Sequence, residues 1–147
     1  MPGIKAVRTI HELPIIKGFR PLWMHPNYRS AITLHLEEYE VLRLMDYEGM
    51  IHEQAAQKMQ VSRPTITRIY EQARKKLAKA LVEGRSILIE GGEVQLKGSH
   101  YMCEDCRQKF CIEEETQQNK CPDCGSQRII SLSECFIGGC KCCRKCR

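Results

Sequence analysis

The stretch Val61-Ser62-Arg63-Pro64-Thr65-Ile66-Thr67-Arg68-Ile69 contains the clearest start of a helix in the chain. Ser62 can cap a helix with its hydroxyl, and a proline is tolerated in the first turn because its missing N–H would have no intrahelical partner. Gly84 has the residue type of a helix C-cap. We therefore expect one long helix between Ser62 and Gly84.

This expected helix has one apolar and one basic face. The apolar positions follow the helical period and predict a core stripe, formed by Ile66, Ile69, Tyr70, Ala73 and Leu77. The other positions between residues 62 and 81 hold six basic residues and a single acid, Glu71, so the helix carries a charge of +5, equal to that of the whole chain. Because a solvated face normally mixes both signs, this excess indicates a polyanionic partner.

Two shorter helices are expected before the long one. Large apolar side chains recur every three residues from Leu36 to Met45, with acids in the first turn, where the helix dipole favours them, and Gly49 ends this helix. A second helix is expected over residues 52–59, where two adjacent alanines permit close helix crossing. The tight turn that follows and the basic third helix make the arrangement of a helix-turn-helix.

Such a third helix can read the major groove of double-stranded DNA. At about 100° per residue, Thr67 and Arg68 lie opposite the core stripe, with Pro64 beside them and Arg63 on the leading edge. Arginine can bond a guanine edge in bidentate fashion, and threonine can touch a thymine methyl. Contacts to phosphates, which add affinity without sequence information, are expected from Ser62, Arg74, Lys75, Lys76 and Lys79.

These helices also carry a family resemblance. The stretches over residues 36–50, 53–56, 61–69 and 73–77 resemble the helix-turn-helix of sigma factor region 4. With Ala80-Leu-Val-Glu-Gly84 and Ile89-Glu-Gly-Gly92, the chain more closely resembles the UPF0251 (DUF134) family of small, predicted DNA-binding proteins, over about residues 1–97. The resemblance to region 4 implies base contacts from Arg63, Pro64, Thr67 and Arg68.

Two positions depart from the pattern of region 4. Ile51 stands where the second helix usually has a Ser or Thr cap, and Gln60 stands where the turn usually has glycine. We expect either that Gln60 adopts a left-handed conformation at some cost or that the turn has another geometry.

The rest of this part of the chain predicts less regular structure. Residues 1–34 contain three X-Pro breaks and are interpreted as an irregular arm, whose aromatic residues favour packing on the next domain over contact with a polyanion. Residues 87–96 predict a β-hairpin with a Gly91-Gly92 turn. The expected fold is a mainly α N-terminal domain, with the helix-turn-helix and the hairpin over residues 35–97.

Cysteine usage divides the chain, because all ten cysteines follow residue 99. Cys103-x2-Cys106 and Cys121-x2-Cys124 are two CxxC motifs at the spacing of a zinc ribbon. Four thiolates satisfy tetrahedral Zn²⁺ with no open position, which predicts a structural zinc site in a small β module over residues 98–131. Iron accepts the same ligands, whereas redox CxxC motifs belong to a βαβ pattern that this segment cannot supply.

Residues 132–147 form a cysteine-rich tail. They offer ligands for a second zinc ion or an iron-sulfur cluster, and a flexible end is the alternative interpretation. The cysteines concerned are Cys135, Cys140, Cys142, Cys143 and Cys146.

Composition and motifs disfavour other classes of protein. No apolar run approaches the roughly 18 residues of a membrane helix, and residues 1–20 lack the apolar segment of a secretory signal, so we expect a cytoplasmic protein without a membrane partner. No nucleophile–base pair or phosphate-binding loop favours an enzyme.

The leading hypothesis is a sequence-specific transcriptional regulator. The alternatives are a sigma-like module that binds RNA polymerase or another protein, an RNA-binding module, and a metal or redox sensor acting through the tail. A homodimer is open as well, because many helix-turn-helix regulators bind two half-sites.

Overall fold

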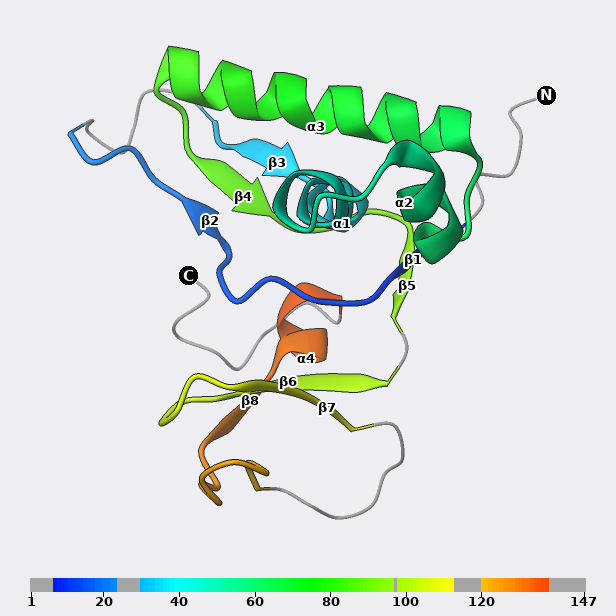
Figure 1. Cartoon of the computed structure of the whole chain (residues 1–147). Coiled ribbons are helices and arrows are strands. Elements are labelled where there is room, and N and C mark those ends of the chain that lie inside the picture. Colours follow the sequence, from blue (N-terminus) through cyan, green and yellow to red (C-terminus); the bar gives the residue numbers. More distant parts are fainter. Residues whose placement is uncertain (1–6, 24–29, 97, 113–119, 138–147) are drawn as a thin grey trace. The chain divides into compact units, whose positions relative to one another are not determined.

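The computed structural model describes residues 7–23, 30–96, 98–112 and 120–137 (Figure 1). The chain divides into two compact units. The first contains the described residues up to 10 and from 16 to 95, and the second contains those from 11 to 15 and from 96 onward.

The helical part of the first unit follows the sequence pattern closely. Its described helices are α1 (Leu36–Leu42), the short π-helical turn η1 (Arg43–Tyr47), α2 (His52–Met59) and α3 (Arg63–Glu83). The hydroxyl of Ser62 accepts a hydrogen bond from the N–H of Thr65, and Gly84 ends α3 in the left-handed conformation with a φ of 62°. Both predicted ends of the long helix are therefore confirmed.

A compact core joins these helices. Figure 1 shows α3 lying across α1 and α2. The buried side chains between the helices include the two alanines of α2 and two isoleucines of the α3 stripe; they are Val41, Leu44, Ala55, Ala56, Met59, Ile66 and Ile69. This packing holds one face of α3 against its neighbours and leaves the opposite face to solvent.

Short strands make up the rest of the first unit. They are β1 (Arg8–Ile10), β2 (Gly18–Phe19), β3 (Ile32–Leu34), β4 (Ile87–Ile89) and β5 (Val94–Leu96). In a three-stranded sheet, β4 is the central strand, antiparallel to β2 and parallel to β3. The strands β1 and β5 form a separate two-stranded sheet.

The expectation of a mainly α N-terminal domain was wrong. Helices account for only 39% of the described residues, which also form three sheets. The described part of the predicted irregular arm, residues 1–34, contributes β1, β2 and β3. These strands find their partners more than 50 positions away along the chain, so no local pattern marked them.

The predicted hairpin over residues 87–96 was also wrong. The strands β4 and β5 pair with different partners, because residues from the N-terminal region occupy the edges that a hairpin would have used. The Gly91-Gly92 pair, with positive φ at both residues, instead carries the chain past the start of α1, where the carbonyl of Gly91 accepts a hydrogen bond from the N–H of Leu36.

The second unit contains an antiparallel sheet and one short helix. The described elements are β6 (Ser99–Cys103), β7 (Lys109–Ile112), β8 (Ile129–Ser131) and α4 (Leu132–Phe136), and the strand order is β7-β6-β8. Leu132, Cys135 and Phe136 of α4 are buried, so α4 contributes to the core of this unit. The predicted tail therefore begins with a packed helix.

Across both units, no helix in the described ranges is long and apolar enough to span a lipid bilayer.

Candidate nucleic-acid interface and candidate metal centre

The turn between α2 and α3 is tight and left-handed. Gln60 adopts a φ of 55° and a ψ of 44°, so of the two alternatives left open by the sequence, the left-handed conformation is the one observed. The N–H of Val61 donates to the carbonyl of Ala56 at 3.1 Å, so the turn directly follows the last residues of α2. Ile51, at the other end of α2, has no polar side chain with which to cap the helix. Its own N–H nevertheless has a partner, because it donates a hydrogen bond to the side-chain oxygen of Gln54 at 3.1 Å.

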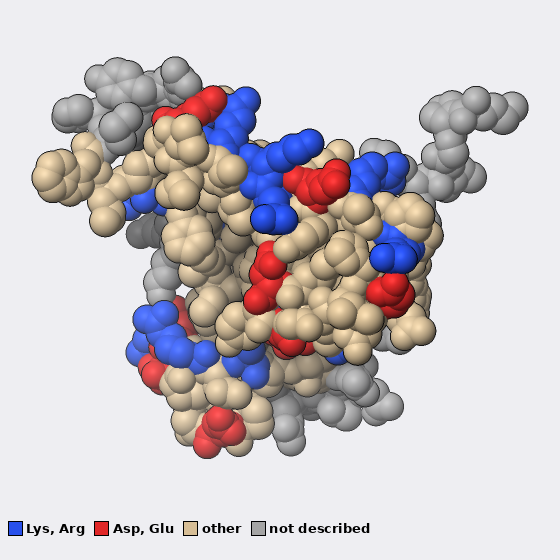
Figure 2. Space-filling view, turned by 45° about the horizontal axis from the view of Figure 1, so that its top comes forward, with Lys and Arg blue, Asp and Glu red and all other residues tan. Residues whose placement is uncertain are grey.

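The face of α3 opposite the core is exposed and basic. Ile66, Ile69 and Ala73 are buried, whereas the basic residues predicted along the helix lie outside, with the exceptions given below. The space-filling view in Figure 2 shows basic side chains spaced over this face, with acidic side chains between some of them. The exposed residues among the predicted DNA contacts are Ser62, Arg63, Pro64, Arg68, Arg74, Lys75 and Lys79.

Two of the predicted contact residues are engaged within the protein. The half-buried Thr67 donates its hydroxyl hydrogen to the carbonyl of Arg63 at 3.2 Å, which leaves its methyl group and its oxygen lone pairs for another contact. The Nζ of Lys76 lies 2.7 Å from Oε2 of Glu38, so this ammonium is directed toward α1.

A cluster around Tyr70 supports Arg74. The hydroxyl of Tyr70 donates to Asp46 at 2.7 Å, and this hydrogen bond, together with burial, raises the pKa of Tyr70 above its usual value. The guanidinium of Arg74 lies 5.3 Å from the centre of the Tyr70 ring, a cation–π distance. The ring of His52 meets the same tyrosine edge-on, with 6.0 Å between the centroids. The sequence pattern indicated only the core role of Tyr70.

Arg63 has a partner that sequence reasoning missed. Its Nε lies 3.2 Å from Oε1 of Glu53, a residue in the first turn of α2. The two residues are ten positions apart and belong to different helices, so neither helical periodicity nor motif spacing indicated the pair.

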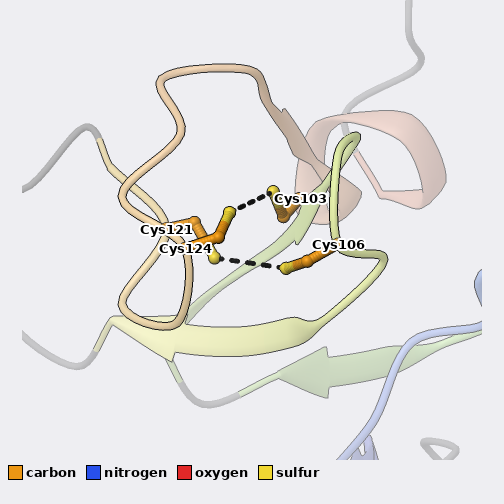
Figure 3. Close-up of side chains that lie close together, drawn as sticks. All are labelled: Cys103, Cys106, Cys121 and Cys124. Carbon is orange, nitrogen blue, oxygen red and sulfur yellow. Dashed lines mark hydrogen bonds between the residues drawn. The ribbon is translucent and has the colours of Figure 1, made fainter.

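The predicted zinc ligands lie together in the second unit. The thiol sulfurs of Cys103, Cys106, Cys121 and Cys124 all lie within 4.8 Å of one another, and Figure 3 shows the four side chains converging on a common centre. The separations between the Cys103 and Cys124 sulfurs and between the Cys106 and Cys121 sulfurs are both 3.6 Å. A tetrahedron with metal–sulfur bonds of about 2.3 Å has edges of about 3.8 Å, so the four cysteines form a group that can hold a metal ion.

Each CxxC motif lies on a similar backbone turn. The N–H of Arg107 donates to the carbonyl of Cys103 at 3.1 Å, and the N–H of Gly125 donates to the carbonyl of Cys121 at 2.9 Å. Arg107 and Gly125 both have positive φ, 64° and 72°, so the chain reverses sharply after each motif. These turns place both thiols of each motif on one side.

The thiols of Cys103 and Cys106 have different pKa values. A hydrogen bond from the backbone N–H of Cys106 favours the thiolate of Cys103 and lowers its pKa to about 7. The backbone N–H of Gln108 acts the same way on Cys106, but burial and hydrogen bonds to the neighbouring thiols outweigh it and raise the pKa of Cys106 to about 12. A bound cation is what would ionise all four together.

Only one of the five tail cysteines lies among the described residues. Cys135 is buried on α4, whereas Cys140, Cys142, Cys143 and Cys146 lie outside the described residues. A second metal site in the tail therefore stays a prediction.

Comparison with known proteins places both units in one family. A family model described as "Protein of unknown function DUF134" matches residues 2–97. The chain belongs to the UPF0251 (DUF134) family. A UPF0251 protein of Chloroherpeton thalassium is 38% identical over 138 residues, which cover 94% of this chain and 91% of that protein. A UPF0251 protein of Clostridium novyi is 39% identical over 142 residues, with coverage of 97% and 94%.

A third UPF0251 protein, from Caldicellulosiruptor saccharolyticus, is 41% identical over 129 residues, with 88% of each chain covered. No solved structure shows significant similarity. The resemblance noted in the sequence ended near residue 97, but these alignments are too long to end there. Similarity within the UPF0251 family thus extends into the cysteine-containing unit.

Proposed function

We propose that this UPF0251 protein is a sequence-specific DNA-binding protein that regulates transcription. In this proposal α2, the left-handed turn at Gln60 and α3 act as a helix-turn-helix, with the exposed face of α3 in the major groove. The observation that supports the proposal most is the exposed basic face of α3, held in place by a buried apolar stripe on the same helix.

Three of the basic side chains on this face are available to an outside partner. Among the described residues, no acid lies within ion-pair distance of Arg68, Lys75 or Lys79. Base readout is assigned to Arg63, Pro64, Thr67 and Arg68 near the start of α3, and phosphate contacts are assigned to Arg74, Lys75 and Lys79 farther along. The hydroxyl oxygen of Ser62 accepts the capping hydrogen bond from the N–H of Thr65, so Ser62 would contact a phosphate by donating its hydroxyl hydrogen.

The metal centre has a structural role in this proposal. Four sulfur ligands leave no open coordination position for substrate or water, and Zn²⁺ is the ion that best matches such a set. The ion would hold together the turn after β6 and the turn before β8, in a unit that has few other buried side chains among its described residues. No catalytic role is proposed for any residue.

An in vitro selection from a random pool of double-stranded DNA, with non-specific competitor at near-physiological salt, tests the proposal. We expect a recurrent motif to be enriched, and a palindromic motif would indicate a homodimer. With the enriched site, Lys75→Ala is expected to weaken binding to all sequences alike and to reduce the salt slope by about one, whereas Arg68→Ala is expected to relax the preference at one base pair.

Retention of DNA without enrichment would contradict base readout. Failure to retain DNA at all would contradict the whole proposal and favour the protein-binding or RNA-binding alternatives.

A further inference from the structure

We propose that Glu53 is a specificity-determining positioning residue, which holds the guanidinium of Arg63 so that its two terminal nitrogens meet one guanine in the major groove. This inference rests on the proposed function, because it assigns a role within the same DNA-binding face. The observation behind it is the ion pair between Nε of Arg63 and Oε1 of Glu53, at 3.2 Å.

The place of each residue in its helix makes the pair relevant to readout. Arg63 is the first residue of α3, and Glu53 is the second residue of α2. The pair therefore bridges the start of the helix that enters the groove and the start of the helix before it. Its geometry depends on the turn at Gln60 and on the packing of Ala56 and Ile66, which fix the two helices relative to each other.

The atom that Glu53 engages matters chemically. A guanidinium has five N–H groups in one plane, of which Nε carries one and the two terminal nitrogens carry four. With Nε held by a carboxylate, both terminal nitrogens are left to donate. Guanine presents two adjacent acceptors, N7 and O6, in the major groove, and the terminal edge of an arginine matches them with two hydrogen bonds.

Stabilisation of the fold does not account for the ion pair between Arg63 and Glu53. The two side chains are 64% and 53% exposed, and ion pairs exposed to this degree add little to folding. A carboxylate close to bound DNA would also repel the phosphates and so lower affinity. An acid at this position is consistent with a gain in selectivity, because an arginine that is already oriented loses less freedom when it binds its base.

The test compares base preferences of variants on the sequence enriched by the wild-type chain. Binding is measured for a panel of sites in which each base pair is replaced in turn. Arg63→Ala identifies the base pair that Arg63 reads. At that base pair we expect Glu53→Gln to lose about tenfold of the preference for guanine, within the range of a bidentate contact, while its affinity for unrelated DNA stays equal or rises.

Two controls separate positioning from a general effect of charge. Glu71→Gln removes the same charge from the exposed face of α3 and is expected to leave the preference at the Arg63 base pair unchanged. In an Arg63→Ala background, Glu53→Gln is expected to change no base preference, because the residue that it positions is gone. Thermal unfolding of each variant checks that the first unit remains folded.

The outcomes distinguish this inference from the function on which it rests. If the wild-type chain enriches a motif but Glu53→Gln keeps the full preference, or shifts the affinity for every site by the same factor, the positioning role is overturned. The positioning role is also overturned if Arg63→Ala leaves the base preference unchanged at every position of the site. If the wild-type chain enriches no motif at all, the proposed function itself fails and the inference fails with it.

Discussion

The Nζ of Lys76 lies 2.7 Å from Oε2 of Glu38, and this ion pair joins the middle of α3 to the first turn of α1. Only 5% of the Glu38 side chain is exposed, and the same oxygen accepts a hydrogen bond from the N–H of His35 at 2.9 Å. The preceding residue of α3, Lys75, is exposed to solvent. Two adjacent lysines on one helix therefore have different roles.

Replacement of Lys76 is expected to affect folding more than DNA binding. Lys76→Ala leaves a nearly buried carboxylate without its cation and should lower the free energy of unfolding by about 2 kcal/mol. Lys75→Ala removes an exposed charge and should change it by less than about 0.5 kcal/mol. Urea unfolding followed by far-UV circular dichroism compares the two variants. Equal stabilities would show that the pair with Glu38 contributes nothing to the fold.

The left-handed turn at Gln60 is expected to carry backbone strain. Gln60→Gly and Gln60→Ala both remove the side-chain oxygen that accepts a hydrogen bond from Thr9 at 3.3 Å, but only glycine adopts a φ of 55° without a steric cost. We therefore expect the glycine variant to be more stable than the alanine variant by about 1 kcal/mol. Thermal melts of both variants measure the difference, and a more stable alanine variant would contradict the assigned conformation.

The docking of β2 on β4 depends on the absence of a side chain at Gly18. This residue has a φ of 152°, and a Cβ added there would overlap the carbonyl oxygen of Ile87 on β4. Gly18→Ala is expected to destabilise the first unit by about 3 kcal/mol, because backbone atoms would have to separate. The matched control is Gly49→Ala, where φ is 74° and no atom lies within 4 Å of the added Cβ.

Gly49→Ala is expected to introduce backbone strain without a steric overlap, and to lower the free energy of unfolding by about 1 kcal/mol. Chemical denaturation of both variants compares the two losses. A Gly18 variant no less stable than the Gly49 variant would mean that β2 does not pair closely with β4.

Loss of one buried thiol from the metal centre is expected to remove one metal ion per chain. Cys121→Ser replaces a buried ligand of the four-sulfur group, whereas Cys111→Ser replaces an exposed thiol of β7 that lies outside that group. Elemental analysis of the purified proteins should give one zinc ion fewer for Cys121→Ser than for wild type and no change at this site for Cys111→Ser. Chelation should likewise unfold the second unit while the helical signal of the first unit persists.

Equal metal contents in wild type and Cys121→Ser would contradict the assignment of the centre. A helical signal that collapses on chelation would contradict the prediction that the first unit stays folded without the metal ion.

Local signals were sufficient to predict the long helix and the group of four cysteines. A serine cap, a proline in the first turn and a terminal glycine specify α3 through interactions within a few residues, and the structure has both ends where they were expected. The CxxC spacing likewise predicted which four sulfurs converge, because each motif forms its own turn. The DNA contacts assigned to α3 remain predictions on this face.

Nonlocal partners account for what was missed. The strands near the N-terminus form only because β4 and β5 supply their hydrogen-bonding edges, and the local pattern of residues 87–96 suggested instead that those two strands pair with each other. Nothing near Lys76 or Arg63 along the chain distinguishes them from the other basic residues of α3. Their partners, Glu38 and Glu53, come from other helices.

Taken alone, the order of amino acids was enough to predict the amphipathic third helix and the four-cysteine group, since the ends of the helix and the turn of each CxxC motif depend on residues close to them in the chain. The pairing of strands, and the choice of which charged residues face inward or meet each other, followed from the way separate elements pack. Hydrogen bonds and ion pairs between distant segments form only after the core has brought their groups within about 3 Å, and local sequence does not encode that distance.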